Sequence, residues 1–127
     1  MMSIFDRLTG SAGKVDNKQA EKVVSEILVS SEQIVSTYKL VRDYIVFTNK
    51  RLILIDIQGI GTKREIQSIP YKSISRFAIE IAGTGDIDSE IDLYISSSVE
   101  PIVTLELGRN RENLNEIART LAEEILG

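Results

Sequence analysis

The sequence predicts a mainly β fold, a seven-stranded and partly open antiparallel barrel that is capped by a C-terminal amphipathic helix and preceded by a short N-terminal helix. Three observations predict it. Short apolar segments recur between residues 33 and 107, turn residues such as Gly, Pro and Asn separate most of them, and helical spacing of apolar residues appears only before and after them. Several short strands separated by turns are typical of a β-barrel or sandwich.

The chain length bounds the domain organisation. Its 127 residues match one domain and are too few for two independent cores. Small residues dominate Thr9–Gly13, so we expect residues 1–15 to form a flexible N-terminal segment. Residues 16–127 are then a single domain, with a core over about residues 30–126.

A helix is predicted over Asp16–Leu28. Asp16 can cap it, Gln19 can complete a capping box, and Val15 can pack onto Ala20. Apolar residues then follow at offsets of 0, 3, 4, 7 and 8 from Ala20, which places them on one stripe that must be covered.

Seven strands are expected after this helix. They cover Gln33–Leu40, Tyr44–Thr48, Arg51–Ile57, Lys63–Ile69, Ser73–Ile81, a strand through residues 86–95, and Ile102–Leu107. The two-residue connection Asn49-Lys50 predicts a tight hairpin, since Asn tolerates a positive φ. The glycine-containing stretches Gly59–Lys63 and Gly83–Gly85 match no phosphate-binding motif and open no helix, so they are interpreted as turns.

The closing helix has the longest helical pattern in the chain. Its apolar residues follow Leu114 at offsets of 3, 4, 7, 8, 11 and 12, with Asn110 as the N-terminal cap and Gly127 as the stop. Such a stripe would cover the open end of a barrel.

Composition excludes several function classes. The net charge of −4 argues against nucleic acid, whose phosphates require clustered Lys and Arg. The chain has no Cys and no His, which removes thiolate and imidazole nucleophiles, bases and metal ligands. We therefore expect no enzyme activity, no cofactor and no metal. No signal-peptide pattern or membrane-length apolar run is present, so a cytoplasmic location is expected.

Two segments carry a resemblance to a known family. The stretch YKLVRDYIVFTNKRLIL from Tyr38 to Leu54, and the stretch SIPYKSISRF from Ser68 to Phe77, closely resemble the signature of the bacterial pleckstrin-homology (PH) domain, formerly classed as a domain of unknown function. The resemblance covers roughly residues 30–126. It implies a PH-like fold without established catalysis, in a family that includes cyclic homo-oligomers thought to present protein-binding surfaces.

Lys39 and Arg42 lie near the first hairpin, where the resemblance to eukaryotic PH domains places phosphoinositide-binding cations. Gripping a multivalent phosphate requires several converging cations, but Asp43 stands beside Arg42 and no third cation is in the loop. A solvated or interface role is favoured for these residues. Anionic-lipid binding is the alternative function, and contact with a membrane is the less expected outcome.

Asn49, Lys50 and Arg51 at the next hairpin are interpreted first as turn chemistry and second as a contact for a partner. Carboxylates at Asp86, Asp88, Glu90 and Asp92 alternate along one strand face. Because they spread along a line and do not converge from a loop, a solvated face that discourages edge aggregation is preferred to a calcium site. A basic protein partner is the second interpretation.

The segments Tyr44–Phe47 and Leu52–Ile55 are apolar on both faces, whereas a strand with water on one side should alternate. One face fills the barrel, and either the Asp16–Leu28 helix or another subunit covers the other. The candidate self-association residues are Tyr44, Val46, Leu52 and Leu54. Together these features predict a noncatalytic PH-like module that self-associates, as a cyclic homo-oligomer, and presents a surface to an unknown protein partner.

Overall fold

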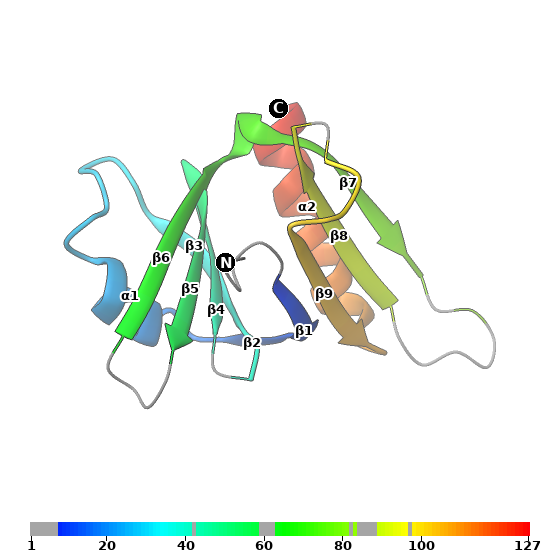
Figure 1. Cartoon of the computed structure of the whole chain (residues 1–127), viewed down its shortest axis with the longest axis horizontal. Coiled ribbons are helices and arrows are strands. Elements are labelled where there is room, and N and C mark those ends of the chain that lie inside the picture. Colours follow the sequence, from blue (N-terminus) through cyan, green and yellow to red (C-terminus); the bar gives the residue numbers. More distant parts are fainter. Residues whose placement is uncertain (1–7, 42, 59–62, 82, 84–88, 97) are drawn as a thin grey trace. The chain divides into compact units, whose positions relative to one another are not determined.

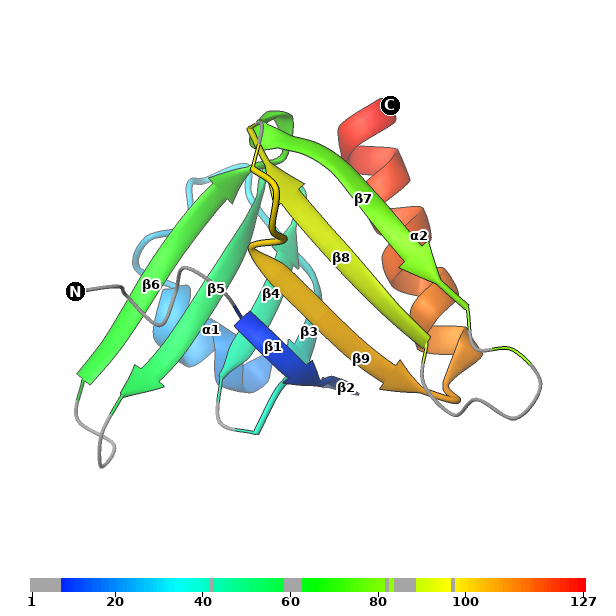
Figure 2. The ribbon, with the colours of Figure 1, turned by 45° about the vertical axis from the view of Figure 1, so that its right-hand side comes forward.

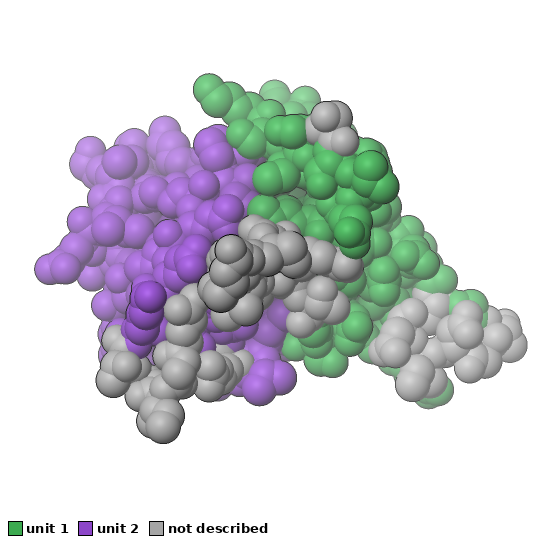
Figure 3. Space-filling model, viewed as in Figure 1, with its two compact units in different colours: residues 1–12, 72–127 green, residues 13–71 purple. Residues whose placement is uncertain are grey.

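The structure, a computed structural model, describes residues 8–41, 43–58, 63–81, 83, 89–96 and 98–127. The chain divides into two compact units (Figure 3): residues 13–71, and residues 1–12 together with 72–127. Each unit has its own β-sheet and its own helix (Figure 1). The mainly β fold expected from the sequence is confirmed.

The unit of residues 13–71 contains a five-stranded antiparallel sheet in the order β2-β3-β4-β5-β6. Its strands are β2 (Gly13–Val15), β3 (Ile34–Lys39), β4 (Tyr44–Thr48), β5 (Arg51–Gln58) and β6 (Lys63–Pro70). The four longer strands agree with the predicted segments to within one residue at each end. Because β4 and β5 are joined by two residues, Phe47 lies opposite Leu52.

The short helix α1 (Lys18–Val24) covers one face of this sheet. Ala20 and Val24 are fully buried against Val46, Ile53 and Ile55. The helix is shorter than the predicted Asp16–Leu28: its cap position is Asn17, and the N–H groups of residues 27 and 28 both bond to the carbonyl of Val24 in a closing turn. Burial of the short stripe against the sheet, and not helix propensity, stabilises so short a helix.

The opposite face of the sheet is equally apolar. Its fully buried residues are Tyr38, Ile45, Phe47, Leu52 and Leu54. The rings of Tyr38 and Phe47 pack edge to face, with their centroids 6.0 Å apart. Such an edge-to-face pair adds stability beyond the area that it buries. Both faces of β4 and β5 are therefore covered, which accounts for their unbroken apolar runs.

The second unit contains a four-stranded sheet in the order β1-β9-β8-β7. The strands are β1 (Leu8–Ser11), β7 (Ile74–Glu80), β8 (Ser89–Ile95) and β9 (Val103–Gly108); a 3-10 turn, η2 (Tyr71–Ser73), precedes β7. β7, β8 and β9 are antiparallel, and β1 pairs parallel to β9. The prediction that residues 1–15 lack fixed structure is wrong for residues 8–15, most of which lie in β1 and β2.

The helix α2 (Arg111–Leu126) packs on β7, β8 and β9 (Figure 2). Leu114, Ile117 and Leu121 of the predicted stripe are buried, whereas Leu126 at its end is 75% exposed. The predicted cap is confirmed, since the side chain of Asn110 accepts a hydrogen bond of 2.9 Å from the N–H of Asn113.

Candidate functional site

Arg51 of the Thr48–Arg51 hairpin forms an ion pair with the buried carboxylate of Glu32. The guanidinium of Arg51 donates two hydrogen bonds of 2.9 Å to the carboxylate of Glu32, from Nε to Oε2 and from Nη2 to Oε1. It also donates to the carbonyl of Ile27 and to Ser68. The hydroxyl of Thr48 donates to Glu32 at 2.6 Å. Arg51 therefore ties the loop after α1 to β5 and β6 through four hydrogen bonds.

Electrostatics in this cluster favour the ionised acid. Burial raises the pKa of Glu32, but hydrogen bonds from Arg51, Thr48 and the N–H of Val29, with the charge of Arg51, outweigh it and leave the pKa below its ordinary value. A buried carboxylate is tolerated only with such partners.

Asn49 also has a structural role. Its Oδ1 accepts from the N–H of Gln33 at 2.7 Å and its Nδ2 donates to the carbonyl of Ser31. Asn49 does not adopt the positive φ that this residue type tolerates. Among the described residues other than glycine, only Ser96 has a positive φ. Asn49 and Arg51 thus hold the turn to the loop before β3, and Lys50 is exposed at the tip.

Among the described residues, the cations that the sequence suggests for lipid binding do not gather into a cluster. Arg42 lies outside the described residues, and Asp43 accepts a hydrogen bond from the N–H of Ile57 through Oδ1 at 3.0 Å. The ammonium of Lys39 lies 5.8 Å from the ring centroid of Tyr44. These two residues line a shallow hollow beside α1 that also contains the carboxylate of Asp16. One cation beside one carboxylate is a poor site for a multivalent phosphate.

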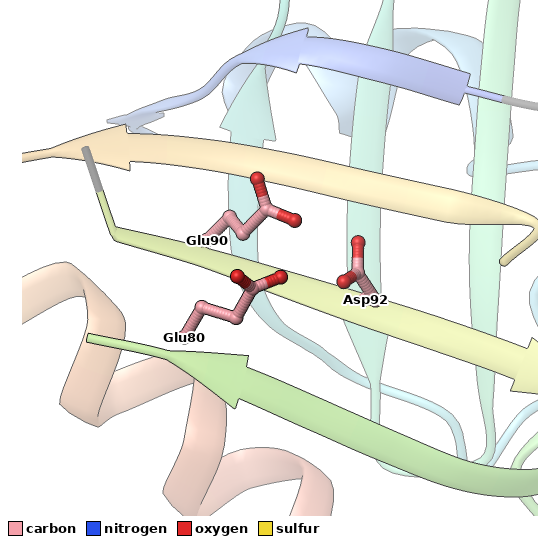
Figure 4. Close-up of side chains that lie close together, drawn as sticks. All are labelled: Glu80, Glu90 and Asp92. Carbon is pink, nitrogen blue, oxygen red and sulfur yellow. The ribbon is translucent and has the colours of Figure 1, made fainter. Parts of the chain in front are cut away.

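Three carboxylates gather on the four-stranded sheet (Figure 4). Glu80 lies opposite Glu90 in the β7–β8 register, and Asp92 follows two residues later on the same face. One carboxylate oxygen from each lies within 4.8 Å of the others, so these are the described residues that could share a cation or a proton. Of the predicted stripe, Asp86 and Asp88 lie outside the described residues, and Glu80 was not predicted.

This carboxylate cluster is not a simple solvated face. Asp92 is 7% exposed and accepts a hydrogen bond of 2.7 Å from the hydroxyl of Thr104. Burial, reinforced by hydrogen bonds with Glu80 and Asp92 and by their charges, raises the pKa of Glu90 to about 7. Close carboxylates retain a proton in this way because the like charges repel. The expectation of a solvated stripe is therefore corrected at Asp92.

Three of the four candidate self-association residues are fully buried in the folded chain. Val46, Leu52 and Leu54 have no exposed surface, and only Tyr44 is half-buried. Of the two alternatives left open for the outer face of β4, the N-terminal helix is the one that the structure supports, since α1 packs on Val46. These three residues offer no contact surface in the folded chain, which corrects the prediction for them.

The structure shows which strand edges are open, which the sequence alone does not show. β6 pairs only with β5, and β7 only with β8, in the part of the chain that the structure describes. Exposed apolar side chains lie on both edges: Ile66 is 37% exposed and Ile79 is 38% exposed. Unpaired N–H and C=O groups along an edge are a ready template for another strand. The sequence gives little indication of which strands lie at an edge, because that depends on the order of the strands in the sheet.

Comparison with known proteins accounts for this arrangement of sheets and helices. A family model described as "Bacterial PH domain" matches residues 3–125. The chain belongs to the bacterial PH domain family. The uncharacterized protein YjqA of Bacillus subtilis (strain 168) is 45% identical over 122 residues, covering 95% of this chain and 97% of YjqA.

Two solved structures are similar to this bacterial PH domain over most of its length. A DUF1696 family protein with a pleckstrin-homology domain from Shewanella loihica PV-4 gives a TM-score of 0.77 at 39% identity, covering 91% of this chain and 98% of that one. A pleckstrin homology domain from Shewanella amazonensis SB2B gives 0.67 at 46% identity, covering 89% and 90%. The resemblance read from the sequence and the PH-like fold that it implies are confirmed.

The family signature now has a structural explanation in this bacterial PH domain. Thr48 and Arg51 donate hydrogen bonds to the carboxylate of Glu32, and Asn49 bonds to the backbone of Ser31 and Gln33. The Thr-Asn-Lys-Arg sequence therefore holds the loop before β3 in place. Tyr71 of the Pro-Tyr-Lys block donates a hydrogen bond of 2.7 Å to the carbonyl of Thr48. No helix in the described ranges is both long and apolar enough to cross a bilayer.

Proposed function

We propose that this bacterial PH domain is a noncatalytic module that self-associates and presents a surface for protein–protein interaction. The open edges of β6 and β7 carry the proposal. Each edge offers backbone groups and exposed apolar side chains, the two elements that bind an added strand. Strand addition satisfies the main-chain groups and covers Ile66 and Ile79 at the same time.

The noncatalytic part rests on chemistry. A sequence without Cys and His lacks the usual nucleophiles and bases. The cluster of three carboxylates in the described residues combines a buried Asp92, held by Thr104, with Glu90, whose pKa burial and the neighbouring carboxylates raise to about 7. These carboxylates repel one another when ionised, and Glu80, Glu90 and Asp92 form no nucleophile–base pair among themselves.

A head-to-tail contact between different edges would favour a ring. Contacts of two unlike surfaces repeat from copy to copy, and they close when the rotation between copies allows. The exposed Lys39 and Lys50 would remain free for a different protein, because neither belongs to β6 or β7.

Two differently tagged copies expressed together test self-association. We expect capture of one tag to bring down the other copy in comparable amount, and an unrelated monomer carrying the second tag to stay in the flow-through. Recovery of the captured copy alone, at expression levels where both are abundant, would contradict the proposal.

A further inference from the structure

A hollow of about 350 Å³ opens beside the β4–β5 turn, within the unit of residues 13–71. Three segments line it: the loop between α1 and β3, the turn itself, and the end of β6. Its lining residues are Val29, Glu32, Lys50, Arg51, Ser68 and Pro70, and we call it the Lys50 hollow. Ligand pockets have volumes of about 300–1,000 Å³, so this one suits a few side chains of a partner and not a large cofactor.

The carboxylate in the Lys50 hollow is already saturated with hydrogen bonds. An ionised carboxylate offers about four lone-pair sites on its two oxygens. In Glu32, Oε1 accepts from the N–H of Val29 and from Nη2 of Arg51. Its Oε2 accepts from the hydroxyl of Thr48 and from Nε of Arg51. A lysine or arginine from a partner would therefore find no free lone pair on this carboxylate.

Hydrogen-bond donors, in contrast, remain on the other polar residues of the hollow. Arg51 uses four of its five N–H groups in its four hydrogen bonds, which leaves one on Nη1. The hydroxyl of Ser68 accepts from Arg51, so its own hydrogen can be donated. The ammonium of Lys50 makes no hydrogen bond or ion pair with any residue that the structure describes. The polar capacity left in the hollow therefore favours an acceptor.

Charge and apolar surface narrow the choice of ligand. Arg51 and Glu32 neutralise each other, so Lys50 leaves the hollow with a net positive charge, although the whole chain has a net charge of −4. Val29 is 54% exposed and Pro70 is also exposed, and both offer apolar surface. A matching ligand carries a single negative charge, accepts several hydrogen bonds and has an apolar group beside the charge.

We propose, extending the protein-interaction part of the function proposed above, that the Lys50 hollow binds a Glu or Asp side chain of a protein partner together with a neighbouring apolar side chain. The carboxylate accepts from Lys50, from Nη1 of Arg51 and from the hydroxyl of Ser68. The apolar side chain covers Val29 and Pro70. Hydrogen bonds to an ionised group are about twice as strong as those between neutral groups.

The ion pair prepares the site for this ligand. Glu32 and the carbonyl of Ile27 hold the guanidinium of Arg51 in one orientation, and its side chain is still 22% exposed. A donor that is fixed before binding loses less conformational freedom when the ligand arrives. A phosphate group matches less well, because its charge of about −2 at neutral pH would meet a single uncompensated cation.

Fluorescence anisotropy of labelled peptides on the intact chain tests the inference. The probe is a peptide with the sequence Ser-Val-Glu-Val-Ser, labelled at its N-terminus and amidated at its C-terminus, so that Glu carries its only carboxylate. The comparison peptide has Gln in place of Glu. At 0.15 M salt, which screens distant charges, we expect the Gln peptide to bind about tenfold more weakly.

Matched variants locate the binding. Lys50→Glu should weaken binding of the Glu peptide about tenfold, whereas Lys22→Glu, the same change of charge at an exposed position on α1, should leave it unchanged. Val29→Ser should also weaken binding. Its control is Val35→Ser, because Val35 is 49% exposed and lies outside the hollow. Circular dichroism checks that all four variants are folded.

Several results would overturn the inference. They are equal binding of the Glu and Gln peptides, equal effects of Lys50→Glu and Lys22→Glu, and no binding at about 1 mM protein. Tighter binding of a phosphoserine peptide would assign the hollow to phosphate instead. A Gln peptide with a free C-terminal carboxylate that binds as well as the Glu peptide would assign it to a chain end.

Self-association is measured separately, by the tagged copies. An assembled chain that binds no peptide would contradict this inference alone. A monomeric chain that binds the Glu peptide through Lys50 would contradict the proposed assembly and support the Lys50 hollow as a binding site.

Discussion

Arg51 and Glu32 are 19 positions apart in the chain and form a bidentate ion pair in which both hydrogen bonds measure 2.9 Å. The Glu32 side chain is only 1% exposed, whereas that of Arg51 is 22% exposed. The pair fixes the loop between α1 and β3 on the β4–β5 hairpin. The pair stabilises the fold at a hairpin whose residues the sequence interprets first as turn chemistry and second as a partner contact.

Arg51→Ala should destabilise the domain strongly. The change leaves the Glu32 carboxylate buried without its cation, which typically costs about 3–5 kcal/mol. Lys50→Ala, one residue earlier and exposed, should change the free energy of unfolding by less than about 0.5 kcal/mol. Urea denaturation of the two variants measures the difference, and equal small losses would show that the pair contributes little.

Glu90→Gln should stabilise the domain at pH 8 more than at pH 5. The pKa of Glu90 in the folded state is about 7, above its ordinary value of 4.5, so the folded state binds more protons than the unfolded state between these values. Stability contributed by this site therefore falls as pH rises through the window from 4.5 to 7, and the penalty is complete above it.

The charged groups beside Glu90 are Glu80 on β7, Asp92 on β8 and Glu106 on β9, all acids. A neutral Gln removes the repulsion at high pH. Thermal melts at the two pH values measure the effect, with Glu123→Gln as the exposed control on α2. A gain that is the same at both pH values would rule out a raised pKa at Glu90.

Leu121→Ala should lower the melting temperature by about 10 °C. Leu121 is fully buried in the contact of α2 with its sheet, and such truncations cost about 2–5 kcal/mol. Arg119→Ala removes an exposed side chain from the same helix and should have little effect. Similar small shifts for both variants would contradict the packing described for α2.

Binding to vesicles containing phosphatidylserine or phosphoinositide should be weak at 0.15 M salt. Lys39 is a single cation whose hollow also contains Asp16, and exposed charge pairs of this kind are screened at that ionic strength. Co-sedimentation measures it. Strong binding that is lost in Lys39→Glu would favour the anionic-lipid alternative over protein interaction.

Much of the fold could be predicted because its signals are local. The bounds of β4 follow from the apolar run and the Asn-Lys turn, and the start of α2 follows from Asn110. β1 could not be predicted: its sequence, Leu8–Ser11, has little strand character, and it forms by pairing with β9 almost a hundred positions later.

The candidate site was less predictable for the same reason. Glu80 joins Glu90 only through the β7–β8 register, and Glu32 is an isolated acid until the hairpin brings Arg51 to it. The apolar residues Val46, Leu52 and Leu54 were predicted to contact another copy because a sequence does not show which face α1 covers. The open edges of β6 and β7 follow from strand order, which no single segment encodes.

The solution mass of the unmodified chain tests self-association most directly. Light scattering after gel filtration, repeated from about 1 to 100 µM protein, gives that mass without reference to shape. We predict a value several times the 14.2 kDa of one chain, holding or rising with concentration. A mass of 14.2 kDa that stays constant across the whole range would contradict the central claim.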